Sequence, residues 1–191
     1  MPRDDLPILS FPSQASWEAW LKKHHTKSQG IYLKIAKKDS GIRSVDYQQA
    51  LEGALCYGWI DGLKQPLNQD YWLQRFTPRR PRSKWSQVNC NKINALEKAG
   101  RLKPAGVLQV EAAKEDGRWE RAYAPASTAT IPADFRIALA AVPKAKANFA
   151  KLSASWRYRV LYRIHEVKRP ETRARRIAQL VERLASSEPL R

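Results

Sequence analysis

WIDGLKQPLNQDYWLQRFT, at residues 59–77, carries the strand and turn signals on which the predicted fold rests. Segments 59–65 and 70–77 contain aromatic and branched residues that favour strands. Between them, the Pro-Leu-Asn-Gln sequence at 66–69 is typical of a tight turn, because proline restricts φ and asparagine bonds to nearby backbone. The pattern predicts a β-hairpin.

Two segments before the hairpin also carry a strand pattern. Residues 8–11 form a short apolar run that stops at a proline, which is typical of an edge strand. Residues 30–35 alternate in polarity, which places Ile31, Leu33 and Ile35 on one buried face. With the hairpin, these segments predict a small sheet.

Helices are expected between these strands. Ser13 or Ser16 is the expected cap of the first, whose apolar side carries two tryptophans and a leucine. Asp46 and Gln49 have the spacing of a capping box, which starts a second helix that ends at Gly58. The order strand, helix, strand, helix, hairpin predicts an α+β fold, with a small, mainly antiparallel sheet and helices on one face.

The rest of the chain is expected to be helical. Helices are predicted to start at Ser86 and at Pro104, and a glycine follows each. Beyond residue 132, apolar residues recur at helical spacing, which predicts an all-helical C-terminal module. The apolar face of one of its helices is expected to consist of Trp156, Val160, Leu161, Ile164 and Val167.

The predicted domain organisation has three parts. An α+β domain spans 1–123, a linker spans 124–131, and the helical module spans 132–191. We expect the module to dock on the first domain, because a free module would expose the apolar stripes of its helices.

The net charge of +17 is distributed unevenly. Residues 70–104 contain nine lysines and arginines against two acidic residues, and residues 132–191 contain fourteen against five. Such zones suit nucleic acid, an anionic membrane surface or a phosphorylated ligand, and they also suit a solvated basic surface that keeps the protein dissolved. We expect the partner to be an anionic small molecule or nucleic acid.

Cysteine usage and hydropathy indicate the compartment. Cys56 and Cys90 are too few for a disulfide framework and fall at buried helical positions, which suits a reducing environment. The N-terminus has no continuous apolar stretch, and no later run approaches membrane-spanning length. We expect a cytoplasmic protein without a transmembrane segment.

The densest positive charge follows the hairpin, in the sequence PRRPRSKWS at residues 78–86. If Ser86 starts a helix, its free backbone N–H groups favour an anion, which arginine forks bind well and Trp85 stacks on or covers. The predicted anion site comprises Arg79, Arg80, Arg82, Ser83, Lys84, Trp85, Ser86 and Asn89.

A structural role for these residues remains open. In that alternative the arginines pair with Glu52, Asp61 and Asp70, and the tryptophans belong to the core. Asp61 is then a turn residue or an arginine partner, although a lone carboxylate at a strand end is also a candidate general base.

Other polar clusters carry less information. Arg169, Arg173, Arg175 and Arg176 form a second basic cluster at the start of the last predicted helix, where positive charge opposes the helix dipole. The histidines lack partners at metal-ligand spacing, so we expect no metal, no cofactor and no catalytic residue set.

Motifs in both halves of the chain resemble those of a known family. They include ALCYGWIDG at 54–62, FTPRR at 76–80 and KRPETR at 168–173. With these motifs the chain resembles the YdeI/OmpD-associated proteins, also called bacteriocin-protection proteins, over nearly its whole length. The resemblance implies tolerance of stress or of antimicrobial peptides and contact with a porin, and it implies no catalytic residue and no cofactor.

Three classes of function remain open. The first is a non-enzymatic cytoplasmic protein that binds a phosphate- or carboxylate-bearing ligand. The alternative is a general nucleic-acid-binding protein, because tryptophans and tyrosines interleave with the positive charge. The third is an enzyme whose reaction the sequence does not specify.

Overall fold

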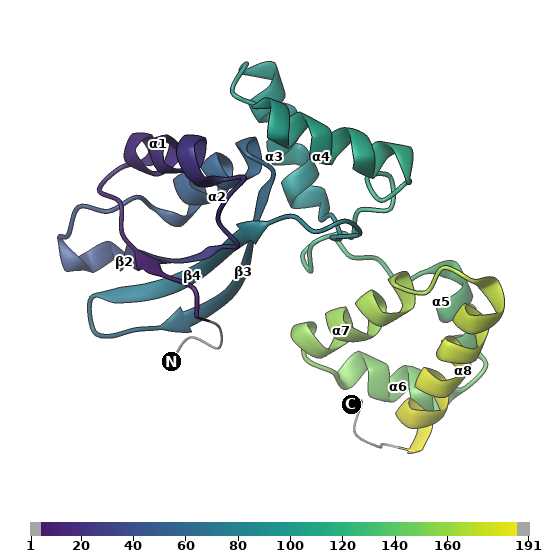
Figure 1. Cartoon of the computed structure of the whole chain (residues 1–191). Helices are drawn as coiled ribbons and strands as arrows, with labels where there is room; N and C mark the ends of the chain where they lie inside the picture. Colours follow the sequence, from purple (N-terminus) through teal and green to yellow (C-terminus); the bar gives the residue numbers. More distant parts are fainter. Residues whose placement is uncertain (1–4, 187–191) are drawn as a thin grey trace. The chain divides into compact units, whose positions relative to one another are not determined.

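The computed structural model describes residues 5–186, and the chain divides into two compact units, Met1–Ala122 and Tyr123–Arg191. Residues 1–4 and 187–191, at the ends of the predicted domain and helical module, lie outside the described residues. Figure 1 shows a sheet with helices in the first unit and helices in the second. The predicted α+β class is confirmed.

The first unit is built on a four-stranded sheet of order β1-β2-β4-β3. Its strands are β1 (Ile8–Leu9), β2 (Ile31–Ala36), β3 (Trp59–Pro66) and β4 (Tyr71–Pro78). The predicted hairpin is confirmed as the antiparallel pair β3–β4, and β4 also pairs antiparallel with β2. The short edge strand β1 runs parallel to β2.

Local capping signals set the first two helices. Ser13 caps α1 (Gln14–His24) in a reciprocal capping box with Ser16. Asp46 and Gln49 form the predicted capping box at the start of α2 (Tyr47–Cys56). A single 3₁₀ turn, η1 (Lys38–Ser40), lies between β2 and α2.

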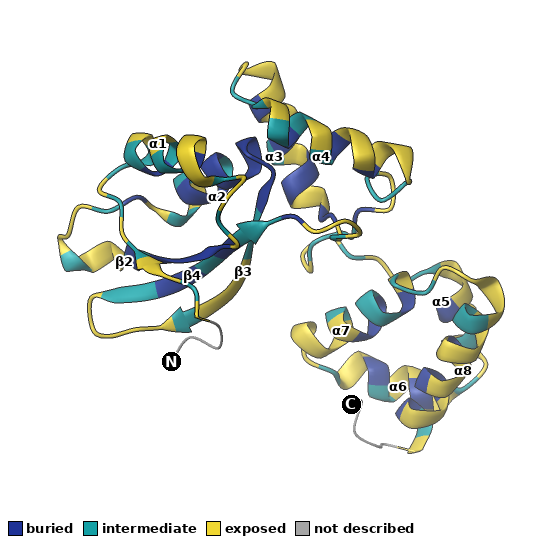
Figure 2. Ribbon diagram, viewed as in Figure 1, coloured by how far each residue is buried: buried dark blue, intermediate teal, exposed yellow. Residues whose placement is uncertain are grey.

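The helices α1 and α2 cover one face of the sheet (Figure 1) and enclose the core of the first unit. Ile31, Leu33 and Ile35 are buried on this face, as the alternation predicted. They pack in one cluster with Trp17 of α1 and Leu55 of α2, among others. Helix α1 has an exposed outer side, whereas α2 is buried over most of its length (Figure 2). Part of the buried surface of α2 faces a neighbouring helix, since Gly53 lies against Trp17 of α1.

Two more helices complete the first unit, α3 (Gln87–Lys98) and α4 (Pro104–Glu115). Helix α4 approaches the end of α2 closely, and two glycines permit this. A Cβ atom on Gly106 would lie 2.5 Å from the carbonyl oxygen of Cys56, and one on Gly58 would lie 2.7 Å from that of Ala105. Gly58 also has a φ of 73°, which favours glycine.

In the described part of the second unit, four helices surround a separate core. They are α5 (Ala133–Ala140), α6 (Pro143–Lys151), α7 (Ala154–His165) and α8 (Pro170–Ser186). The core includes Phe135, Phe149, Ile164 and Ile177. Phe135 and Phe149 meet edge to face with ring centroids 5.4 Å apart.

The predicted apolar face of α7 needs a correction. Val160, Leu161 and Ile164 are buried, but Trp156 is 37% exposed and Val167 lies beyond the end of the helix, half-buried. Trp156 falls on the same helical stripe as Val160, one turn earlier, and the described core does not reach that first turn. Its indole therefore belongs to the surface of the second unit.

Candidate anion-binding surfaces

The basic loop at residues 79–86 places its first arginine inside the first unit. Arg79 is only 6% exposed, and its guanidinium carbon lies 3.5 Å from the ring centroid of Trp85. Its Nη1 donates a hydrogen bond to the carbonyl oxygen of Lys84 at 3.1 Å, and its backbone N–H donates to Gly58 at 3.0 Å. Arg79 thus braces the loop against the end of α2.

A tight turn exposes the other cations of the loop. Arg82 has a φ of 74°, and the backbone N–H of Arg80 donates to Ser83 Oγ at 2.9 Å. The carbonyl oxygen of Ser83 accepts a hydrogen bond from Arg118 Nη1 at 2.9 Å. Arg80, Arg82 and Lys84 are exposed, so they remain accessible on the described surface.

Ser86 caps α3 as predicted, with its side chain accepting from the backbone N–H of Asn89 at 3.2 Å. Both residues are buried, and Trp85 packs against Trp119 with ring centroids 4.9 Å apart. The structure therefore separates the eight predicted site residues. Arg79, Trp85, Ser86 and Asn89 lie in the interior, Ser83 is half-buried, and the three remaining cations lie outside.

Two of the three acidic residues considered as partners of the loop, Asp61 and Glu52, contact other groups. Asp61 accepts a hydrogen bond from the hydroxyl of Tyr47 at 2.8 Å. Glu52 pairs with Arg101 at 2.9 Å and with Lys92 at 3.8 Å. Because Tyr47 belongs to α2, this hydrogen bond joins Asp61 of β3 to α2 and gives Asp61 a structural role.

The second predicted basic cluster also divides. Arg173 pairs with Asp134, its Nε lying 2.6 Å from Oδ2, and its Nη1 donates to the carbonyl oxygen of Ile164 at 2.8 Å. It thereby joins α5, α7 and α8. Hydrogen bonding from Arg173 lowers the pKa of the Asp134 carboxyl below its usual value. Arg169, Arg175 and Arg176 are exposed.

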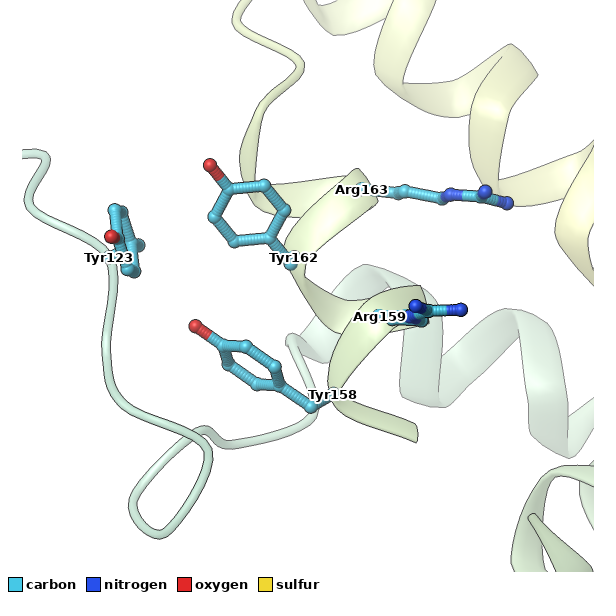
Figure 3. Close-up of a pocket in the computed structure, with 5 residues that line it drawn as sticks. All are labelled: Tyr123, Tyr158, Arg159, Tyr162 and Arg163. Carbon is cyan, nitrogen blue, oxygen red and sulfur yellow. The ribbon is translucent and has the colours of Figure 1, made fainter. Parts of the chain in front are cut away.

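Helix α7 carries a surface that the sequence analysis did not single out. A hollow of about 460 Å³ lies beside it, lined by Tyr123, Tyr158, Arg159, Tyr162 and Arg163. Tyr158 and Tyr162 lie one turn apart and project toward Tyr123 (Figure 3). The rings of Tyr123 and Tyr162 meet edge to face with centroids 5.2 Å apart, and Tyr158 donates to the carbonyl oxygen of Ala124 at 3.0 Å.

Arginines form a second stripe on the same helix. Arg159 and Arg163 lie one turn apart, and their side chains extend in a similar direction (Figure 3). The guanidinium carbon of Arg159 also lies 4.9 Å from the ring centroid of Trp156. We call the set formed by Tyr123, Trp156, Tyr158, Arg159, Tyr162 and Arg163 the aromatic–arginine surface.

A smaller hollow, of about 260 Å³, shares Tyr123, Tyr158 and Tyr162 with the first one and also reaches His165 and Arg173. Burial raises the pKa of the Tyr158 hydroxyl, with the neighbouring tyrosines adding to the effect, so this group stays a neutral donor at physiological pH. The aromatic–arginine surface therefore offers tyrosine rings and the neutral Tyr158 hydroxyl on the side of α7 toward Tyr123, whereas the guanidinium groups of Arg159 and Arg163 extend away from Tyr123 (Figure 3).

The first unit has a hollow of its own, of about 370 Å³, at the point where α4 begins. Lys22, His25, Tyr57 and Lys103 line it. This hollow is basic. Among its described lining residues, Tyr57 and the imidazole of His25 are the aromatic rings, so it has fewer than the hollow beside α7.

Comparison with known protein families divides the chain near the boundary between its two compact units. Residues 9–109 match a family model described as a domain of unknown function, DUF8412. This match covers 101 of the 191 residues, more than half of the chain. The chain belongs to the DUF8412 family.

The C-terminal part matches a second family model. Residues 128–187 match the model described as bacteriocin-protection, YdeI or OmpD-associated. The resemblance noted from the sequence is confirmed there, but its N-terminal motifs fall within the DUF8412 match. No curated protein and no solved structure matches the chain.

The two matches separate the candidate surfaces. The basic loop lies in the DUF8412 segment, and the aromatic–arginine surface, apart from Tyr123, lies in the YdeI/OmpD-associated segment. Within the described residues, no cluster of three or more histidine, cysteine or acidic side chains could hold a metal ion. No helix in the described chain has the length and apolar character that crossing a bilayer requires.

A periodic signal for the aromatic–arginine surface was present in the sequence. Tyrosines at 158 and 162 and arginines at 159 and 163 repeat at a spacing of four, so each pair shares one side of a helix. Summing charge over a whole segment concealed this pattern, because the sum does not record which side of a helix carries the charge.

Proposed function

We propose that this protein is a non-enzymatic binding protein for ligands that carry phosphate or carboxylate groups, and that the aromatic–arginine surface binds them. The observation that carries the proposal is the pair Arg159 and Arg163 beside a tyrosine-lined hollow of about 460 Å³. Small-ligand sites commonly have volumes of roughly 300–1,000 Å³. Guanidinium groups favour phosphate and carboxylate because both offer oxygens that match the arginine fork.

The charge around α7 supports an anionic ligand. Between Asp134 and Glu166 the sequence contains seven lysines and arginines and no aspartate or glutamate. Asp134 itself is engaged by Arg173. This local excess of positive charge attracts an anion.

The exposed part of the basic loop is proposed as a second anion-binding site, formed by Arg80, Arg82 and Lys84. These side chains are exposed next to the N-terminus of α3. Because Arg79, Trp85, Ser86 and Asn89 serve the interior, this proposal is narrower than the eight-residue site expected from the sequence. Arg82→Lys keeps the charge but removes the fork, so it should weaken a fork-specific ligand and leave nonspecific polyanion binding unchanged.

The biological setting is also part of the proposal. The family description of residues 128–187 supports a role in tolerance of bacteriocins or related stress. Cys56 and Cys90 are buried, unpaired thiols, which is compatible with action in the reducing cytoplasm.

Thermal unfolding at constant ionic strength tests the proposal, with inorganic phosphate, pyrophosphate and a nucleoside monophosphate as probes. The test variant is Arg159→Gln/Arg163→Gln. The control is Arg136→Gln/Lys151→Gln, which removes the same charge from exposed positions of the same unit. A ligand at ten times its Kd stabilises the folded state by about 1.4 kcal/mol.

We expect at least one probe to raise the melting temperature of the parent and of the control, but not of the test variant. If test and control variants respond alike to every probe, the α7 assignment is wrong. Melting without ligand shows whether each variant is folded before any probe is added.

A further inference from the structure

The aromatic–arginine surface has two parallel stripes of different chemistry. Tyr158 and Tyr162 form one, and Arg159 and Arg163 form the other, shifted by one residue and hence by about 100° around the helix. Trp156 lies two residues before Tyr158, hence about 200° around the helix and on the far side of the arginine stripe. It is 37% exposed, with Arg159 against its ring. Rings with guanidinium groups alongside are the combination that binds bases and phosphates together.

The spacing within each stripe favours bases that are separated from one another. Side chains four residues apart are offset by about 6 Å along a helix axis, whereas stacked bases in a duplex are about 3.4 Å apart. Rings at this spacing fit bases that are spread apart and unpaired, as in a single strand. The hollow of about 460 Å³ beside Tyr123, Tyr158 and Tyr162 provides space for such a base.

The tyrosines are held in place by the segment that leads into the second unit. Tyr158 donates to the carbonyl oxygen of Ala124 at 3.0 Å, and Tyr123 contacts Tyr162 edge to face. Rings that are already ordered lose less conformational freedom on binding. The duplex alternative is less favoured, because paired bases offer only their edges and these rings need base faces.

We propose that the aromatic–arginine surface binds single-stranded nucleic acid, with bases against the tyrosines and Trp156 and with phosphates on Arg159 and Arg163. This inference rests on the proposed function, since it requires that the two arginines bind anions. It adds that the natural ligand carries unpaired bases.

The test measures fluorescence anisotropy of labelled 12-residue oligomers bound to the full-length chain. Oligo(dT) and oligo(U) are compared with a 12-mer of abasic deoxyribose phosphate, which has the same backbone charge without bases, and with a 12-base-pair duplex. Because stacking of one base on an aromatic ring strengthens binding by about tenfold, oligo(dT), oligo(U) or both should bind at least tenfold more tightly than the abasic oligomer. Which of the two binds more tightly shows whether the strand is DNA or RNA.

Variants assign this preference to residues. Tyr162→Leu should lower the affinity for the base-bearing oligomer about tenfold and leave abasic binding unchanged. Tyr158→Phe keeps the ring and loses only the hydrogen bond to Ala124, so it should lower that affinity less than Tyr162→Leu does. Trp156→Ala, at an exposed position, gives a second test if Tyr162→Leu is unstable. Arg159→Gln/Arg163→Gln should weaken every oligomer and reduce the slope of log K against log salt by about 1.4, as for two single-strand phosphates.

The outcomes distinguish the two proposals. Equal binding of abasic and base-bearing oligomers, both lost in the arginine variant, would overturn the nucleic-acid inference and leave anion binding at α7 intact. Duplex binding as tight as single-strand binding would also overturn it. Failure of the arginine variant to change any binding would refute both.

Discussion

Replacing Gly106 by alanine sets two effects of opposite sign against each other. Helix propensity alone favours alanine by about 1 kcal/mol within a helix such as α4. The new Cβ atom, however, would lie 2.5 Å from the carbonyl oxygen and 3.0 Å from the carbonyl carbon of Cys56. Both are backbone atoms, so α4 must move away from α2.

Movement of α4 has a cost that exceeds the gain in propensity. Overpacking in a folded interior costs roughly 1–3 kcal/mol. The shift also strains the hydrogen bond from the backbone N–H of Lys103 to the same oxygen, 3.1 Å long, and a bond of this kind contributes about 1 kcal/mol. Subtracting the propensity term, we expect Gly106→Ala to lower the free energy of unfolding by about 1–3 kcal/mol.

Urea unfolding followed by tryptophan fluorescence measures this change in the first unit, because six of the seven tryptophans precede residue 123. Ala112→Gly is the matched control, since Ala112 is exposed on α4 and its replacement changes propensity alone, by about 1 kcal/mol. An unchanged or increased stability for Gly106→Ala would refute the close-approach argument.

Three further changes test the core, an ion pair and the thiols. Leu55→Ala should cost about 2–5 kcal/mol in urea unfolding, because Leu55 is buried in the first core, and a cost below about 1 kcal/mol would contradict this. The Arg173 hydrogen bond lowers the pKa of Asp134, so the pair stabilises the fold above the ordinary aspartate pKa of about 4, and this contribution is lost as pH falls through the lowered pKa. Melting temperatures of the parent and Asp134→Asn should therefore differ at neutral pH and converge in strong acid, and a constant difference would show that the ion pair is not the cause. Burial raises the pKa of Cys56 and of Cys90 to about 11, so a disulfide reagent at neutral pH should modify them only at the rate of unfolding, and fast modification of the folded protein would contradict their burial.

Local sequence signals account for the elements of the first unit. The hairpin β3–β4 follows from two strand-forming segments around a proline-containing turn, and the caps Ser13 and Asp46 act within three residues of their own positions. These signals need no partner from a distant part of the chain. The strands and helices that they predict are therefore confirmed with boundaries within a few residues.

The interior position of Arg79 could not be inferred in the same way. In the sequence it is one of four cations within six residues, and all four appear equivalent. What separates it from Arg80 is the stacking of its guanidinium on Trp85 and the carbonyl oxygens of Gly58 and Lys84 nearby. Tertiary packing brings those groups together, and the spacing of residues in the sequence does not predict this arrangement.

Helical periodicity also could not predict which aromatic side chains of the second unit lie at its surface. Periodicity assigned Trp156 to the same stripe as Val160, yet it cannot tell where along a helix the core ends. Likewise, the spacing of four between Tyr158 and Tyr162 places them on one side of α7, whereas the approach of Tyr123 across the hollow depends on the path of residues 123–132.

The α+β class, the hairpin, the helix caps and the excess of positive charge can all be predicted from the sequence, because each depends on composition or on interactions between residues close in the chain. Which cations brace the fold, as the buried Arg79 and the half-buried Arg173 do, and which are exposed, as Arg159 is, depends on tertiary packing. The physical reason is that burial and pairing depend on neighbours contributed by distant segments, such as Asp134 for Arg173. A charged side chain has the same local propensity whether or not such a neighbour reaches it.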